Sequence, residues 1–428
     1  MPKKIIFFMG IFFSFILFTT SVRATVDAEV AYIFNTFSFL VCGFLVMWMA
    51  AGFLFLESGL VTTRSVSTIA AKNIGKFAVV SVVFYLCGYN LGYGVPEGGY
   101  IGSFSIWTDT TSLETGYSGA SDWFFQTLFV CATCSIVSGA VAERIKIWPF
   151  FVFCAILGGI IYPIQMSWEW GGGWLDALGF ADFAGSTLVH ACGGSAALAG
   201  VILLGPRLGR FSDSGKPVNM APFAPSSIPL VALGTFILWM GWFGFNGGSQ
   251  LALGSFEDAT AMSKIFMNTQ LAACGGCIAG AVITRLVGGK TDVVMMLNGA
   301  LAGLVSITAE PLMPSPILSI GIGAVGGIIM YYGTNLLNFL HIDDVVGAIP
   351  VHMFSGIFGT LVVPLSNPDA SFAIQLLGVF SVCIFVFITS YIVILIIKNT
   401  MGLRISKEAE KLGTDKAEIG VIAYSIRD

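Results

Sequence analysis

Two stretches of the sequence share one pattern: Asp182-Phe-Ala-Gly-Ser-Thr-Leu-Val-His-Ala-Cys-Gly-Gly194 and Asp344-Val-Val-Gly-Ala-Ile-Pro-Val-His-Met-Phe-Ser-Gly356. Both follow D-x2-G-x3-V-H-x3-G and contain two of the chain's three histidines, His190 and His352. A lone histidine in an apolar membrane helix often only bonds to a neighbouring helix, but its cost commonly marks a functional site. The matched frames predict one site built from two halves of the chain.

The composition is that of an integral membrane protein. Of the 428 residues, 56% are hydrophobic and 10% are charged, whereas soluble domains carry roughly 25% charged residues. The 52 glycines favour closely packed membrane helices. The net charge of −4 points to no nucleic-acid partner. No Gly-Lys-Ser/Thr loop or dinucleotide glycine pattern occurs, which argues against an ATP-driven pump.

The nine cysteines lie in apolar segments and include two CxxC pairs, Cys131/Cys134 and Cys274/Cys277. Redox and metal sites use this spacing, but no histidine or carboxylate lies near either pair in the sequence. We therefore interpret these cysteines as small packing residues and expect neither a metal nor a cofactor.

The chain divides into three regions. Residues 1–24 resemble a signal peptide, with Lys3 and Lys4 before an apolar run and Val22-Arg-Ala24 before the expected cleavage point. An uncleaved first helix is the alternative. A membrane domain is expected over 25–398 and a charged cytoplasmic tail over 399–428.

Eleven apolar segments in the membrane domain approach the length of about 20 residues that spans a bilayer. They are expected at 31–56, 70–94, 122–142, 147–167, 184–205, 226–248, 266–287, 294–310, 316–338, 347–365 and 372–398.

Basic residues occupy alternate loops and the tail. Arg144 and Lys146, for example, follow the third segment, whereas the opposite loops are acidic. The positive-inside rule then predicts a multi-pass protein of the cell (inner or plasma) membrane, with its N-terminus outside and its C-terminus in the cytoplasm. The loop His341-Ile-Asp-Asp344 is an exception, because it is cytoplasmic yet acidic.

This topology explains why the motif occurs twice. His190 lies in the fifth segment and His352 in the tenth, and two units of five spans insert with opposite orientations. Inverted repeats of this kind place transporter sites near the membrane midplane. The predicted fold is all-α, an inverted 5+5 repeat followed by an eleventh helix.

Aromatic residues gather toward the predicted outer side. Trp168, Trp170 and Trp174 precede Asp182, and the run from Trp242 to Ser249 ends the sixth segment. Aromatic faces attract cations, although an interfacial aromatic belt explains any single tryptophan equally well. Asp182 could cap the following helix, support a cation, or do both.

Charged residues also lie near the inner ends of the first two segments. Glu57 follows an apolar run, and Lys72, Asn73 and Lys76 open the second segment. We expect these side chains to pair with one another or to extend toward the cytoplasmic surface rather than to serve the pore.

The histidine pair itself suggests proton handling. Imidazole donates from one nitrogen, accepts at the other, and titrates near neutral pH. Two histidines alone rarely hold a metal, and the G-x-S-x-G elbow of a hydrolase is absent. A transporter, not an enzyme, is therefore the class that the residues favour.

The chain resembles the ammonium transporter (Amt/Mep/Rh) family, on its Amt side, over almost its whole length after residue 24. The resemblance lies in the order and spacing of several stretches: Phe55-Leu-Glu-Ser-Gly-Leu60, Ile136 to Ile145, Trp170-Gly-Gly-Gly-Trp-Leu175, Asp182 to His190, Leu203 to Gly209, Gly241 to Asn246, His341 to His352, and Gly402-Leu-Arg-Ile-Ser406.

This resemblance implies a homotrimer with one narrow pore in each subunit. It implies an external ammonium-recruitment site of Phe129, Trp170 and Ser249, and a gate of stacked rings from Phe129 and Phe245. His190 and His352 would form a twin-histidine pair, and Asp182 the acid that supports binding and deprotonation. The residue after the second histidine is Met353 where glycine is usual, Ser355 stands where cysteine is common, and Pro350 precedes the pair, so rate or selectivity could differ.

We expect ammonium to bind outside, lose its proton near Asp182 and the phenylalanine gate, and cross as ammonia, with a possible proton relay over the histidines. The alternatives are an ammonium sensor with little transport and an Rh-like channel for neutral gas. The resemblance also implies that the tail packs under neighbouring subunits, with a PII-type regulatory protein as a possible cytoplasmic partner. A solvated helix at Lys407–Lys411 is an equal alternative for that part of the tail.

Overall fold

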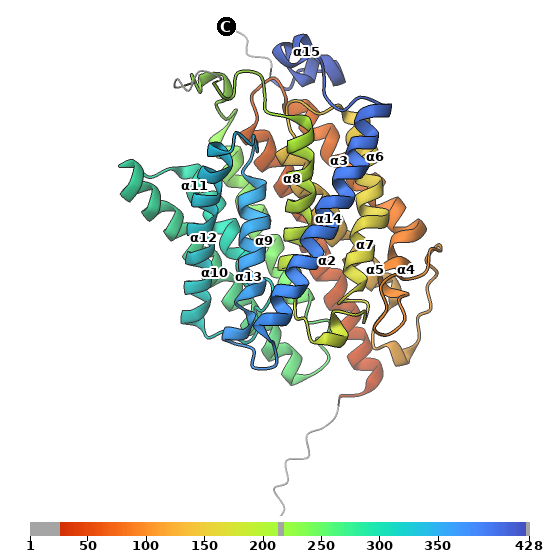
Figure 1. The fold of residues 1–428 in the computed structure, drawn as a ribbon. Helices are drawn as coiled ribbons and strands as arrows, with labels where there is room; N and C mark the ends of the chain where they lie inside the picture. The colour runs from red at the N-terminus through yellow and green to blue at the C-terminus, as the bar shows by residue number, and fades with distance from the viewer. Residues whose placement is uncertain (1–25, 213–217, 425–428) are drawn as a thin grey trace, which may run out of the picture.

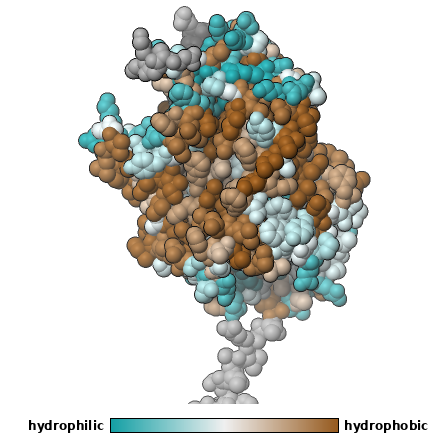
Figure 2. Space-filling model, in the orientation of Figure 1, coloured by the Kyte–Doolittle hydropathy of each residue, from teal (hydrophilic) through white to brown (hydrophobic). Residues whose placement is uncertain are grey.

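A computed structural model describes residues 26–212 and 218–424 of the chain. The signal peptide expected at residues 1–24 lies outside these described ranges. Figure 1 shows a bundle of long helices that run in roughly one direction, with the start of α2 at the lower end and α15 at the upper end. Figure 2 shows a broad hydrophobic band around the middle, with hydrophilic residues gathered at the two ends.

All eleven expected segments are helical, and no strand interrupts them in the described ranges. Nine are long and apolar enough to span a membrane, and two are shorter, Val293–Ile307 and Ile349–Leu365. The first repeat contains α2 (Ala28–Leu60), α3–η1–α4 (Val66–Val83, Phe84–Gly88, Tyr89–Tyr93), α5 (Gly119–Ala140), α6–η3–α7 (Ile147–Ile156, Leu157–Ile161, Tyr162–Ser167) and η5–α8 (Ser186–Ala191, Cys192–Leu204).

The second repeat contains α9 (Ile228–Gly248), α10 (Phe256–Gly288), α11 (Val293–Ile307), α12 (Pro316–Phe339) and η7–α13–η8 (Ile349–Phe354, Ser355–Leu361, Val363–Leu365). The eleventh helix is α14 (Phe372–Thr400), and the tail holds α15 (Lys407–Leu412) and η9 (Asp415–Ile419). Short 3-10 turns lie in the loops: η2 (Leu113–Thr115), η4 (Asp176–Leu178) and η6 (Ala221–Phe223).

The largest difference from the expected boundaries is in α10, which begins ten residues before position 266. The Ser255 hydroxyl accepts a hydrogen bond from the amide of Asp258 at 3.0 Å, and Glu257 and Asp258 lie in the first turn. A cap and acidic residues stabilise a helix start. The helix therefore begins in polar sequence that hydropathy alone does not identify.

The first helices of the two repeats, α2 and α9, pack along one another. Glycines permit this approach: a β-carbon on Gly52 would lie 2.8 Å from the Cγ of Leu238, and one on Gly234 would collide with the backbone of Leu56. Close packing through small residues is typical of membrane helices. These two helices also reach the histidines: Phe53 of α2 lies against His352, and Trp242 of α9 lies against His190.

Candidate functional site

The first copy of the repeated motif forms a capped π-helical turn. Gly185 has φ +102°, a left-handed conformation that a side chain would strain. The carboxylate of Asp182 accepts four backbone N–H bonds, from Gly185 (3.2 Å), Ser186 (2.7 Å), Thr187 (2.8 Å) and Leu188 (2.8 Å). The π-helix η5 then carries His190. Such π-turns occur frequently at functional sites.

The second copy repeats this local structure. Gly347 has φ +77°, and the carboxylate of Asp344 accepts N–H bonds from Gly347 at 3.1 Å and Ile349 at 2.7 Å. The π-helix η7 carries His352, with Pro350 in its first turn, where a missing N–H is tolerated. The shared spacing of aspartate, glycine and histidine therefore encodes the same turn twice.

The two turns bring the histidines together. Nδ1 of His190 lies 3.1 Å from Nδ1 of His352, and both side chains are buried. Such a bond requires one nitrogen to donate and the other to accept. Nε2 of His190 is also buried and has no hydrogen-bond partner in the described protein. One nitrogen of the pair therefore remains available to a molecule beside it.

The last glycine of each motif copy packs against the other repeat. A β-carbon on Gly194 would lie 2.5 Å from Cβ of Met353, beside His352, and one on Gly356 would collide with the carbonyl of Ser186. The unusual Met353 is thus accommodated by the absence of a side chain at Gly194. The hydroxyl of Ser355 donates to the carbonyl of Pro350 at 3.2 Å, so two of the departures support η7 together.

Aromatic rings form a column between His190 and Trp170, on the side of the histidines that was expected to face outward. The rings of Phe129 and Phe245 stack with centroids 3.9 Å apart, and both are buried. Trp170 meets Phe129 edge-on at 5.9 Å and is only partly buried. The hydroxyl of Ser249 donates to the carbonyl of Phe245 at 2.8 Å, which places it one turn beyond that ring. The structure therefore joins the three rings in one column and places Ser249 at the end of α9, one turn beyond Phe245.

The sequence analysis placed Trp242 in an external aromatic group, but the structure does not. It is fully buried and stacks on His190 with ring centroids 4.9 Å apart. Its indole N–H donates to the Thr308 hydroxyl at 2.8 Å, which satisfies the polar end of the ring. Trp242 lies one turn before Phe245, so helical periodicity was the available signal that it faces the same side.

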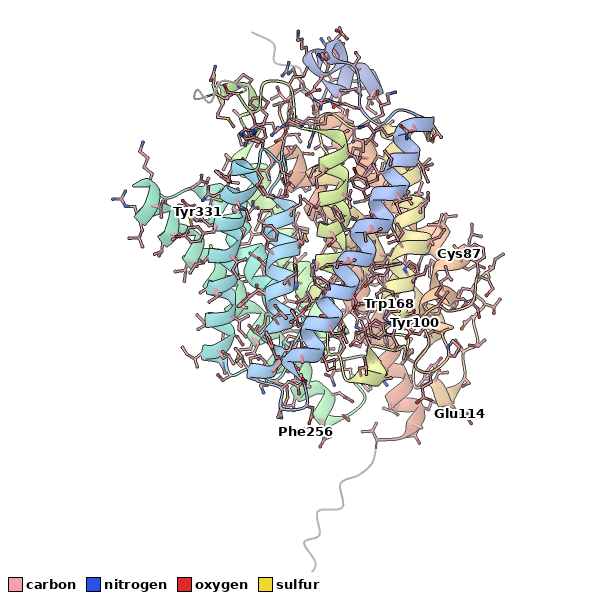
Figure 3. The ribbon with its side chains drawn as sticks, in the orientation of Figure 1. Cys87, Tyr100, Glu114, Trp168, Phe256 and Tyr331 are labelled. Atoms are coloured by element: carbon pink, nitrogen blue, oxygen red, sulfur yellow. The ribbon has the colours of Figure 1, made fainter. Side chains whose placement is uncertain are left out.

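The outer loop holds Trp170 against Asp182. The indole N–H of Trp170 donates to the backbone carbonyl of Asp182 at 3.0 Å. Nearby, the indole N–H of Trp168 donates to the carbonyl of Tyr100 at 2.9 Å, and Figure 3 shows these two residues close together in the lower part of the molecule. These bonds fix the orientation of the aromatic loop relative to the η5 turn.

A second carboxylate, Glu169, lies beside Asp182. One oxygen of Glu169 accepts the backbone N–H of Asp182 at 3.2 Å. Burial raises the pKa of Asp182 to about 6, although its four amide bonds act in the opposite direction. Burial, and then the charge of Asp182, raise the pKa of Glu169 well above its usual value. The raised pKa favours the neutral acid at Glu169, so Asp182, which is largely ionised at pH 7, supplies the negative charge near Trp170 that could attract a cation.

Of the two alternatives expected for the lysines of the second segment, extension to the surface is wrong, whereas pairing is confirmed for Lys76, which donates to Oδ1 of Asn73 at 3.0 Å. Lys72 and Lys76 are 1% and 0% exposed, and Glu57 is 0% exposed. Nζ of Lys72 donates to the carbonyl of Ser138 at 2.8 Å, so the side chain points inward to α5. Hydropathy places a lysine near a helix end but does not show whether its side chain faces lipid or protein.

Buried ion pairs explain the acidic loop at His341–Asp344, which was expected on the cytoplasmic side. The carboxylate of Asp343 accepts from the guanidinium of Arg207 at 2.8 and 2.9 Å and lies 3.4 Å from Arg210. Burial would raise the pKa of Asp343, but the bonds and charge of Arg207 lower it to about 2. Asp344 caps η7. Both acids therefore have local partners, which removes the apparent conflict with the positive-inside rule.

The tail packs beneath the helices of its own subunit. The carboxylate of Asp415 accepts the backbone N–H groups of Ser67 at 3.0 Å and Thr68 at 2.7 Å, at the start of α3. Glu410 pairs with Arg404 at 2.7 Å, so α15 is not merely a solvated charged helix. The tail thus connects the start of α3 to the end of α14.

Other chemistry is not apparent among the described residues. No group of three or more histidine, cysteine or acidic side chains could hold a metal ion within residues 26–212 and 218–424. All nine cysteines are free, and the Cys131/Cys134 pair is buried, as expected for packing residues.

Comparisons with known proteins agree with this geometry. The sequence profile of the Ammonium Transporter Family matches residues 37–424. Ammonium transporter Amt2 of Archaeoglobus fulgidus is 39% identical over 415 residues, covering 90% of this chain and 87% of its own. Ammonium transporter Amt1 of Methanocaldococcus jannaschii is 33% identical over 400 residues, covering 91% and 97%.

Two solved structures share the fold. A Sensor Amt Protein superposes with a TM-score of 0.85 at 31% identity, covering 92% of this chain and 100% of its own. Mep2 of Candida albicans superposes with a TM-score of 0.80 at 27% identity, covering 93% and 92%.

Proposed function

The chain belongs to the ammonium transporter family, and we propose that it conducts ammonia through a pore at the twin histidines after deprotonating ammonium at its outer mouth. Family membership and fold support a multi-pass membrane protein that transports ammonium. We propose the route that ammonia and the proton take through the protein. The observation that carries it is the buried pair of Nδ1 atoms at 3.1 Å, with the free Nε2 of His190 beside the aromatic column.

Recruitment begins at Trp170, Phe129 and Ser249. An aromatic face attracts a cation by roughly 0.5–2 kcal/mol, and the ionised carboxylate of Asp182 adds negative charge nearby. Because all four bonds to the Asp182 carboxylate come from backbone amides, Asp182 acts through its charge and as a cap. It attracts the cation without needing to bind it directly.

The stacked rings of Phe129 and Phe245 then separate the ion from the pore. A whole ammonium ion in this apolar column would be costly because it would lose its hydration. Neutral ammonia avoids most of that cost and can accept or donate a hydrogen bond at Nε2 of His190. The proton follows through the paired imidazoles, which makes transport electrogenic.

We also propose an oligomeric state, a membrane orientation and a regulatory partner. By family membership the protein forms a homotrimer in the cell membrane, with its N-terminus outside and its tail in the cytoplasm. The position of the tail beneath the start of α3, bound by Asp415, supports a cytoplasmic docking site for a PII-type regulator. No cofactor enters this scheme.

Two other functions remain candidates. Similarity to a Sensor Amt Protein favours a sensor that binds ammonium with little flux. The apolar column alone would also suit a channel for neutral gas. The partly buried Trp170 beside the ionised Asp182 argues against the channel, since a neutral gas needs no cation site.

One experiment separates the three functions. Purified protein in proteoliposomes is given ammonium pulses while charge movement is recorded on a solid-supported membrane and internal pH is followed with a trapped dye. A saturable current supports the proposed transporter. Internal alkalinisation without current supports a gas channel. Ammonium binding without current or alkalinisation supports a sensor and contradicts the proposal.

A further inference from the structure

A cluster of three buried ionisable side chains lies toward the inner side of the histidines. Glu57 comes from α2, and Lys72 and Lys76 come from α3; none is more than 1% exposed. Ionisable side chains within membrane helices are rare and commonly mark ion or proton pathways. The transport scheme above leaves all three without a role.

The hydrogen bonds of the cluster hold its lysines on α5 but leave part of its carboxylate free. Lys72 donates to the Ser138 carbonyl at 2.8 Å, and Lys76 donates to the Ser135 hydroxyl and to Oδ1 of Asn73. Oε2 of Glu57 accepts the Ser138 hydroxyl at 2.7 Å. Oε1 of Glu57 is buried and has no hydrogen-bond partner in the described protein.

Glu57 shares a small cavity with His352. The cavity has a volume of about 20 Å³, and its lining includes both of these residues and Phe53. About 10–15 Å³ is enough for one water molecule. Because Nδ1 of His352 faces His190, Nε2 is the remaining atom of His352 that can exchange a proton with a water molecule in this cavity.

Positive charge lies near this cavity, because Lys76 donates a hydrogen bond to Ser135, one of the lining residues. Nζ of Lys76 lies 5.9 Å from the ring centroid of Phe53, whose own centroid lies 6.1 Å from that of His352. The positively charged side chains of Lys72 and Lys76 favour the ionised form of the Glu57 carboxylate and oppose the entry of other cations. They therefore keep Glu57 as a deprotonated carboxylate that can receive a proton and release it again, and they disfavour a bound metal ion.

We propose that Glu57 is the inner proton acceptor of the pore, receiving through one water molecule the proton that leaves His352. This inference rests on the proposed proton relay. The N–H bond at Nε2 of His352 breaks, the water passes on a proton, and an O–H bond forms at Oε1 of Glu57. The neutral acid then releases the proton to cytoplasmic water, where ammonia accepts it and ammonium forms again. Lys72 and Lys76 are positioning residues.

A purely electrostatic role is the main competing explanation, because Glu57 also offsets the charge of the lysines. Two variants separate the roles. Glu57→Gln removes the acceptor and leaves an excess positive charge. Glu57→Gln combined with Lys76→Met removes the acceptor but restores the net charge of the cluster. Glu57→Asp keeps an ionisable acceptor and serves as the conservative control.

The full-length protein is reconstituted, and current and ammonia entry are recorded together. We expect Glu57→Gln and the double variant both to lose at least about tenfold in current, while ammonia entry changes less than about twofold and Glu57→Asp keeps a measurable current. Recovery of current in the double variant would overturn the proposal, because Glu57 would then only balance charge. Parallel loss of current and ammonia entry would also overturn it, as would an unchanged current.

His352→Ala is measured alongside to separate this inference from the relay on which it rests. If His352→Ala loses current and Glu57→Gln keeps it, the relay stands and Glu57 is not its acceptor. If both variants keep full current, the relay itself is contradicted. Should Glu57→Gln fail to fold, the charge-balanced double variant alone decides between the roles.

Discussion

Gly194 and Met353 touch across the boundary between the two inverted repeats, so closely that a β-carbon on Gly194 would lie 2.5 Å from Cβ of Met353 and 2.8 Å from its backbone nitrogen. Real β-carbons do not approach other atoms this closely, so any larger residue at position 194 must move the turn that carries His352. The distance between the histidines thus depends on a glycine four residues beyond one of them.

Gly194→Ala should therefore separate the imidazoles and lower ammonium-evoked current at least about tenfold in proteoliposomes. Overpacking of this kind also costs roughly 1–3 kcal/mol of stability. Gly200→Ala is the matched control on α8, because its nearest contact is a side-chain atom of Val141 at 3.2 Å. Equal currents in the two variants would show that the contact between Gly194 and Met353 does not control the distance between the two imidazoles.

The two capping aspartates provide a paired test of charge at the outer mouth. Asp182→Asn and Asp344→Asn each weaken the cap of one π-turn, and each should lower stability by about 1 kcal/mol. Only Asp182 lies beneath Trp170. We expect Asp182→Asn to raise the ammonium concentration for half-maximal current at least about fivefold and Asp344→Asn to change it less than twofold. Equal shifts would contradict a recruiting role for the Asp182 charge.

The ion pair of Asp343 predicts a dependence of stability on acid. Its pKa is depressed from 3.8 to about 2 in the folded protein. The stabilisation is therefore present above pH 3.8 and is lost as the pH falls toward 2; it amounts to about 2 kcal/mol. Asp343→Asn should lower the melting temperature at pH 7 and flatten its fall below pH 4, whereas Asp369→Asn, at an exposed position, should do neither. Parallel acid profiles for Asp343→Asn and the wild type would exclude this contribution.

The tail contact predicts a change in protease sensitivity. Ser65 provides no side-chain cap for α3, and the carboxylate of Asp415 supplies the missing acceptor. Asp415→Ala should release the tail and make trypsin cleave at Lys407, Lys411 or Lys416 several-fold faster. Glu408→Ala, in the same tail but fully exposed, is the control. Equal cleavage rates would show that Asp415 does not hold the tail in place.

The sequence alone predicted the eleven helices and the pairing of His190 with His352, because apolar length, loop charge and a repeated frame are local signals. It did not predict that Gly194 contacts Met353, since a contact between repeats depends on how two helices cross. The prediction that Lys72 and Lys76 extend to the surface was wrong, because the burial of a side chain depends on which helices pack against it. The spacing between Asp182 and Gly185 predicted the capping role of Asp182. No pattern in the sequence predicted that Glu169 lies beside Asp182.

The central claim is that a proton crosses through the histidine pair while ammonia uses the pore beside it. The most direct measurement records ammonium-evoked current and internal pH for wild type and His352→Ala in the same proteoliposomes. The account predicts that His352→Ala loses or strongly reduces the current while ammonia still enters. An undiminished current with unchanged selectivity in His352→Ala would contradict the claim.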